Sequence, residues 1–213
     1  MDIVVAQELI KILPSLLWVV FAFTVLYFFY QPIRDELLPK LASFEAGVVK
    51  MSFARESMDA AVELAQKNQR WPVVAPEADR ERVLRRAQRC ARLLADAQVL
   101  WVDDCPDNNV NEIRMFRQLK VAIDVATTTE AALELMKTTE YDLVLSDMAR
   151  GDQTDAGIDF LRQLRVSDNT TPVIFYIGTV NPAKGVPPRA FGLTNRPDEL
   201  LNLTIDVLER KRA

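Results

Sequence analysis

The 213-residue sequence contains no histidine and only two cysteines. The absence of histidine excludes His-dependent catalytic triads, His metal sites and the usual general base of physiological pH. Cys90 and Cys105 lack metal-type spacing and the frame of a small secreted disulfide domain, so a reducing, cytosolic setting is expected. The formal net charge of −4 argues against a general nucleic-acid-binding protein.

A long apolar run near the N-terminus is the first feature that is present. From Ile12 to Tyr30 no residue is charged, and most side chains are apolar. As a helix this run is about 28 Å long, which matches a bilayer core of roughly 30 Å. Trp18 and the aromatic group around Tyr27 are typical of membrane interfaces. We expect an uncleaved, single-pass transmembrane helix within residues 1–31.

Two other structures compete with a membrane anchor. A cleaved signal peptide normally begins with basic residues, whereas Asp2 and Glu8 precede this run. A buried globular helix of this length usually has a polar face, and this run has none. Positive charge is denser after the run than before it, which predicts that the C-terminal part of the chain is cytoplasmic.

Residues 32–97 are predicted to form a helical connector. Apolar residues recur at helical spacing over Glu56–Lys67, and Trp71-Pro72 ends this element because the residue before proline avoids helix. A second helix is expected from Pro76 to Asp96. Its polar face carries Arg80, Arg82, Arg85, Arg86, Arg89 and Arg92. This face is interpreted as solvated, with contact to anionic lipid headgroups or a stalk in a homo-oligomer as alternatives.

At Gln98 the pattern changes to short apolar runs that alternate with amphipathic stretches. Strands are expected at Val99–Val102, Val121–Val125, Leu143–Ser146, Val173–Ile177 and Phe191–Thr194. Helices are expected at Asn109–Gln118, after a cap at Thr129, at Ala156–Val166 and at Asp198–Lys211; prolines weaken the case for a helix after the fourth strand. This alternation predicts the α/β class, as a doubly wound five-stranded parallel sheet over residues 98–213.

Carboxylates follow two of these strands. Asp103 and Asp104 come directly after Val99–Val102, and Asp147 comes directly after Leu143–Ser146. Ligands bind at the carboxyl edge of open parallel sheets, so the three aspartates are expected to meet there if the strands are neighbours. Three like charges in a small volume need a cation or protons, and Mg²⁺ is the hard ion that suits carboxylate oxygens.

Four motifs together resemble the receiver domain of two-component response regulators, over roughly residues 98–211. They are Val99–Asp104, Leu145-Ser146-Asp147, Pro172-Val173-Ile174 and Arg196-Pro197. The resemblance implies a CheY-like, flavodoxin-like sheet. In that family the aspartate that ends the third strand accepts a phosphoryl group from the histidine of a partner kinase. The family's acidic pair, and the carbonyl two residues past the acceptor, hold Mg²⁺.

Carried over by position, the resemblance implies that Asp147 is the phosphoacceptor. It also implies that the Mg²⁺ ligands are Asp103, Asp104, Asp147 and Ala149.

Two positions depart from the family. A Ser or Thr normally ends the fourth strand, where this chain has Ile177, and Thr179 follows two residues later. The family's lysine before proline in the fifth loop is Arg196, which keeps the charge but changes the geometry. Thr179 and Arg196 are therefore the candidates for contacting a phosphoryl group, with ordinary loop roles as the alternative.

The sequence thus predicts a membrane-anchored signalling protein that is not an enzyme. Its receiver-like domain is expected to be phosphorylated, or to act as a degenerate receiver that binds a partner. The resemblance implies a histidine kinase or another signalling protein as partner and the bacterial inner (plasma) membrane as location.

Two other functions stay open. A Mg²⁺-dependent phosphoryl-transfer or phosphatase enzyme is disfavoured, because aspartate-nucleophile phosphatases separate their two aspartates by one residue, whereas Asp103 and Asp104 are adjacent. A structural membrane adaptor with a vestigial acidic pocket is favoured by Ile177.

Overall fold

The computed structural model describes residues 17–25, 27–30, 38–67, 73–167, 169–181 and 183–212, with the side chains of the helix at 38–67 described from Lys50 onward. The chain divides into two compact units, Met1–Val49 and Lys50–Ala213. Much of the predicted connector therefore belongs to the same compact unit as the predicted receiver-like domain. The domain limits expected at residues 31 and 97 stay predictions.

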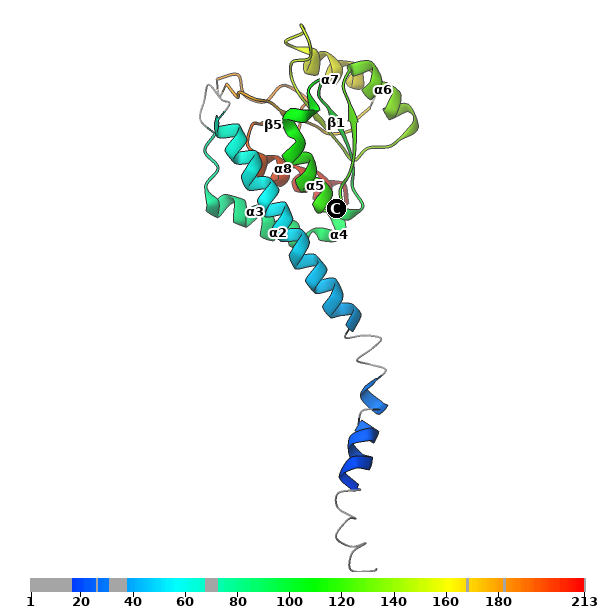
Figure 1. The fold of residues 1–213 in the computed structure, drawn as a ribbon. Coiled ribbons are helices and arrows are strands. Elements are labelled where there is room, and N and C mark those ends of the chain that lie inside the picture. The colour runs from blue at the N-terminus through cyan, green and yellow to red at the C-terminus, as the bar shows by residue number, and fades with distance from the viewer. Residues whose placement is uncertain are drawn as a thin grey trace, which may run out of the picture. The chain divides into compact units, whose positions relative to one another are not determined.

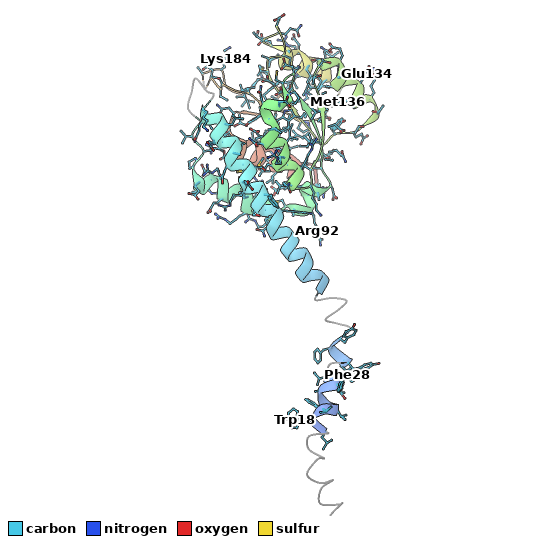
Figure 2. All side chains as sticks on the ribbon, viewed as in Figure 1. Trp18, Phe28, Arg92, Glu134, Met136 and Lys184 are labelled. Carbon is cyan, nitrogen blue, oxygen red and sulfur yellow. The ribbon has the colours of Figure 1, made fainter. Side chains whose placement is uncertain are left out.

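The first unit contains short helical segments at residues 17–25 and 27–30. Their aromatic side chains, including those of Trp18 and Phe28, are exposed and project from the ribbon (Figure 2). Across the residues that the structure describes, no helix combines the length and the apolar character needed to cross a membrane. Residues 12–16 and 26 of the expected span lie outside the described residues.

Five parallel strands form the centre of the second unit. They are β1 (Gln98–Val102), β2 (Ala122–Ala126), β3 (Leu143–Ser146), β4 (Val173–Tyr176) and β5 (Gly192–Thr194). Their spatial order is β2-β1-β3-β4-β5, which confirms the expected five-stranded parallel sheet. The chain leaves β1 toward β2 on one side and later returns to β3 on the other. The carboxyl ends of β1 and β3 therefore form the switch point at which open α/β sheets bind ligands.

Helices cover both faces of this sheet. On one face, α5 (Val110–Gln118) and α8 (Pro197–Arg212) pack in a cluster that contains Trp101 and Tyr176. On the other, α6 (Thr129–Thr138) and α7 (Ala156–Val166) pack in a cluster that contains Leu100 and Phe175. Neighbouring residues such as Leu100 and Trp101 belong to different clusters, because successive side chains of a strand point to opposite faces of the sheet. Figure 1 shows α6 and α7 on the opposite side of β1 from α5 and α8.

From Lys50 onward, three connector helices pack in the same core cluster as α5 and α8. They are α2 (Leu38–Lys67), α3 (Glu77–Arg89) and α4 (Ala91–Ala95). From Lys50 onward, α2 buries one stripe of residues at helical spacing, with Ala54 and Met58 in the same core cluster as Trp101. The α2 helix thus begins well before the expected Glu56, and the predicted helix from Pro76 to Asp96 is divided at Cys90.

Two local expectations need correction, and a third agrees with the structure. The cap of α6 is Thr128 rather than Thr129, because the hydroxyl oxygen of Thr128 accepts the N–H of Ala131 at 3.1 Å. A 3₁₀ turn, η2 (Pro106–Asn109), precedes α5, which therefore begins at Val110. Between β4 and β5 the described residues contain no helix, which fits the prolines in that segment.

Candidate acidic site at the carboxyl edge of the sheet

Three aspartates meet where β1 and β3 end. Val102 and Ser146 are register partners in these neighbouring parallel strands, so the residues that follow them emerge side by side. Carboxylate oxygens of Asp103, Asp104 and Asp147 lie within 4.8 Å of one another. The structure thus brings together the three aspartates that the strand pattern predicted would converge.

Asp103 is the buried member of this group. Its Oδ1 accepts the N–H of Cys105 at 2.7 Å, and its Oδ2 accepts Nδ2–H of Asn109 at 2.7 Å. Burial raises the pKa of Asp103, and the nearby charge of Asp104 raises it further. These two hydrogen bonds hold the carboxylate in one orientation, which is the kind of preorganisation that a metal ligand requires.

Asp104 is exposed and connects the two strand ends. Its Oδ2 accepts the N–H of Gly151 at 2.7 Å, so the loop after β1 is bonded to the loop after β3. Gly151 has a φ of 54°, a left-handed conformation that glycine adopts readily. Ala149, the predicted carbonyl ligand, is an exposed residue in this same loop.

Asp147 is half-buried and has the most perturbed carboxylate of the three. Its Oδ1 accepts the N–H of Met148 at 2.7 Å, and its backbone N–H donates to the carbonyl of Val102 at 2.9 Å. Burial raises the pKa of Asp147 to about 6, with the charges of Asp103 and Asp104 as further causes. Burial and the neighbouring charges thus disfavour the ionised forms of Asp103 and Asp147, and a bound cation would favour those forms.

Gly157 makes the position of Asp147 compatible with α7. A Cβ at Gly157 would lie only 2.5 Å from the backbone oxygen of Asp147 and 2.8 Å from Cε1 of Phe175. Real Cβ atoms essentially never approach so closely, so only glycine lets the first turn of α7 pack under the acceptor loop. The sequence signal that indicates a close contact here is a glycine at the second position of a predicted helix.

The acidic group opens into a cavity of about 360 Å³. Thr179 lines this cavity together with Asp103, Asp104 and Asp147. The cavity is lined on another side by Ala61, Leu64 and Ala65 near the end of α2. The connector therefore contributes directly to the surroundings of the acidic site, which the sequence did not indicate.

Arg196 lies outside this cavity lining. Its Nη2 pairs with Asp198 at 2.5 Å and with Asp79 of α3 at 3.3 Å. The predicted cation is thus engaged between α8 and the connector. Ile177, directly after β4, packs against the apolar cluster that also contains Phe175.

A buried polar pair also lines the cavity. The hydroxyl of Tyr176 donates to Oε1 of Glu112 at 2.6 Å, and Glu112 is only 3% exposed. Burial raises the pKa of Glu112. Its Oε2 is buried, with no hydrogen-bond partner among the described residues. The helical spacing of Glu112 from Phe116 places it on the buried face of α5, and that spacing is the signal that sequence reasoning missed.

Arg150 is a second residue that sequence reasoning missed. It is only 8% exposed, three residues after Asp147, and its guanidinium lies beneath the loop that follows β3. Its Nη1 donates to Oγ of Ser146 and to the backbone oxygen of Asp147, both at 3.0 Å. Its Nη2 donates to Oγ1 of Thr129 and to the backbone oxygen of Ala156, both at 2.9 Å.

Comparison with known proteins agrees with this geometry. Residues 99–186 match the family model described as the response regulator receiver domain. The chain contains a receiver domain. These residues therefore form a receiver domain of the two-component signalling type.

One sequence relative is the aerobic respiration control sensor protein ArcB of Escherichia coli (strain K12). It is 42% identical over 66 residues, which make up 31% of this chain and 8% of ArcB. ArcB of Shigella flexneri matches equally well. The chain therefore spans less than a tenth of the length of these curated relatives.

The solved structures to which this chain is similar include a receiver domain and a response regulator. The receiver domain of Francisella response regulator 1452 is 24% identical, with a TM-score of 0.49, and the match covers 55% of this chain and 99% of that one. Response regulator TrrA of Thermotoga maritima, solved in complex with Mg(2+)-BeF, is 20% identical with a TM-score of 0.46. That match covers 52% of this chain and 98% of TrrA.

Proposed function

We propose that the receiver domain accepts a phosphoryl group on Asp147 from a phosphohistidine of a partner kinase. The observation that carries this proposal is the convergence of Asp103, Asp104 and Asp147, whose oxygens lie within 4.8 Å of one another at the switch point of the sheet. A structural role alone gives no reason to gather three carboxylates, because their mutual repulsion is unfavourable.

Asp147 is the proposed nucleophile. Its Oδ1 accepts the N–H of Met148, so Oδ2 is the oxygen assigned to attack phosphorus. The O–P bond forms as the P–N bond of the partner's phosphohistidine breaks, and the imidazole nitrogen keeps the bonding electron pair. Attack needs the ionised carboxylate, and with a pKa of about 6 most of Asp147 is ionised at neutral pH.

The donor atoms of this site fit Mg²⁺. The three aspartates offer only carboxylate oxygens, and the proposal adds the main-chain carbonyl of Ala149. When bound, Mg²⁺ neutralises negative charge on the transferring group. Asp103 is already oriented by Cys105 and Asn109, so little rearrangement of that ligand is needed. Thr179 lines the cavity and is the hydroxyl proposed to contact a phosphoryl oxygen.

A degenerate receiver that binds a partner without phosphorylation is the second candidate. Two observations favour it: Ile177 stands where a hydroxyl is usual in the family, and Arg196 is paired with Asp79 and Asp198. In this candidate the acidic group binds Mg²⁺ but no phosphoryl group is transferred.

The experiment is an NMR titration of the full chain with Mg²⁺ and then with beryllofluoride, which mimics a phosphoryl group. Phosphoacceptor function predicts that both additions shift resonances around Asp147, and that Asp147→Asn abolishes the second shift. Shifts with Mg²⁺ alone favour the degenerate receiver. If neither addition shifts these resonances, the acidic group is vestigial. Turnover of a phosphate ester that is lost in Asp147→Asn would favour the phosphatase alternative.

For location, we propose a single-pass anchor within residues 1–31 at a bacterial inner membrane, with the receiver domain cytoplasmic. Support comes from the uncharged apolar sequence between Ile12 and Tyr30. Deleting residues 1–31 should release the protein from lipid vesicles in a flotation assay. Continued flotation of the truncated chain with lipid would contradict the anchor.

A further inference from the structure

Arg150 is a buried cation whose hydrogen bonds to the described part of the chain all go to neutral acceptors. Its four bonds go to two hydroxyls, those of Ser146 and Thr129, and to the backbone oxygens of Asp147 and Ala156. Its guanidinium also lies over the ring of Phe160, 5.8 Å from the ring centroid. These contacts satisfy the N–H groups, but they leave the positive charge without a bonded carboxylate.

The charge of Arg150 is instead balanced through space by the acidic site. Burial lowers the pKa of the guanidinium, and the carboxylates of Asp147, Asp104 and Asp103, followed by that of Glu130, act against that effect. A buried ion is tolerated when opposite charge lies nearby. The attraction is mutual, so Arg150 also supplies positive potential at the place where the three aspartates converge.

The same side chain fixes the acceptor loop in space. Its Nη1 bridges Ser146, the last residue of β3, and the backbone of Asp147, while Nη2 reaches Thr129 in α6 and Ala156 in α7. The planar fork of arginine can serve four acceptors in this way, whereas lysine cannot. Arg150 therefore joins three elements at the carboxyl edge of the sheet.

We propose that Arg150 is a positioning residue of the phosphoacceptor site: it anchors the Asp147 loop and supplies the fixed cation that Arg196 does not. This inference rests on the proposed function. The fixed charge of Arg150 acts differently on cations and on anions that bind at this site. A fixed cation opposes the binding of Mg²⁺ but favours an anionic phosphoryl group at the same site, so the two affinities should respond to its removal in opposite directions.

The test uses the full chain and the variants Arg150→Met, Arg150→Lys and Thr129→Val. In Arg150→Met, which keeps a long side chain without charge, the Mg²⁺ affinity should rise several-fold. Beryllofluoride affinity at saturating Mg²⁺ should fall on the order of tenfold, as expected for unit charges several ångströms apart. Thr129→Val, the matched control, removes one acceptor and no charge, so both affinities should stay within about twofold of wild type.

Arg150→Lys keeps the charge and loses the fork, so its beryllofluoride affinity should exceed that of Arg150→Met even if its melting temperature falls. A purely structural role predicts instead that the affinities for Mg²⁺ and beryllofluoride both fall in parallel with stability in the two Arg150 variants. That result would overturn the inference, and so would unchanged affinities in Arg150→Met. Neither result would contradict the phosphoacceptor proposal. A wild-type chain that binds neither Mg²⁺ nor beryllofluoride overturns both.

Discussion

The hydroxyl of Tyr176, at the end of β4, donates a 2.6 Å hydrogen bond to Oε1 of Glu112 in α5, inside the protein core. This pair joins the sheet to the helix that follows the acidic aspartates. It also buries a carboxylate whose Oε2 has no partner among the described residues. The buried carboxylate makes the stability of the fold dependent on pH.

Glu112→Gln should stabilise the protein near neutral pH by about 1 kcal/mol, because the amide removes the buried charge and keeps an acceptor for Tyr176. Burial raises the folded-state pKa of Glu112 above its ordinary 4.5. Its contribution to stability is therefore complete below pH 4.5 and is lost as the pH rises through the folded-state pKa. Urea unfolding between pH 4.5 and 8 should show a flatter pH dependence in the variant, and an unchanged slope would count against this assignment.

Gly157→Ala should destabilise the receiver domain by about 2 kcal/mol, because the new Cβ would clash with the backbone of Asp147 and the ring of Phe175. The variant should also shift the amide resonances of the Asp147 loop. Gly178→Ala is the matched control: a Cβ there meets nothing within 4 Å, so its change should stay within about 0.5 kcal/mol. Equal effects of the two substitutions in thermal unfolding would refute the packing argument.

Mg²⁺ binding should weaken at acidic pH. A bound cation requires the ionised carboxylate, and burial together with neighbouring charges raises the pKa of Asp147 to about 6. Protons therefore compete with the metal below that pH, and the apparent dissociation constant should rise about tenfold between pH 7.5 and pH 5. Calorimetric titration with Mg²⁺ at several pH values measures this dissociation constant. Equal affinity at both extremes would mean that Asp147 is not a metal ligand.

Arg86→Met should loosen the connector from the receiver domain. Its guanidinium bonds Asn202, Asp206 and Glu209 of α8 at 2.5, 2.6 and 2.7 Å and is mostly covered. We expect the free energy of unfolding to fall by about 1–2 kcal/mol and amide hydrogen exchange in α3 to become faster. The control is Arg82→Met, since Arg82 is 73% exposed and, among the residues that the structure describes, pairs with Asp79 of the same helix. We expect its free energy of unfolding to change by about 0.5 kcal/mol or less. Similar exchange rates in the two variants would argue against the docking role.

The sheet was predictable because its strands are buried and apolar. Leu143–Ser146 and Ala156–Val166 have the bounds that the sequence indicated, and the aspartates after β1 and β3 meet as parallel pairing requires. These features depend on the local pattern of apolar residues and on the rule that neighbouring parallel strands end at the same edge of the sheet. The convergence of Asp103, Asp104 and Asp147 was predictable for the same reason.

The direction of individual long side chains was not predictable. Arg196 matches the position of a family cation, yet its partner Asp79 lies more than one hundred residues away in sequence, in a helix whose packing the pattern did not reveal. Arg150 stands out as a charge in a loop, where charges are usually solvated, and only the surrounding oxygens of α6 and α7 explain its burial. Tertiary contacts decide both cases.

The α2 helix is continuous over 30 residues, from Leu38 to Lys67, and is therefore about 45 Å long. From Lys50 onward it belongs to the same compact unit as the acidic cavity, which Ala61 and Ala65 line. A ligand that fills this cavity is therefore bordered by the last turns of α2 as well as by the three aspartates.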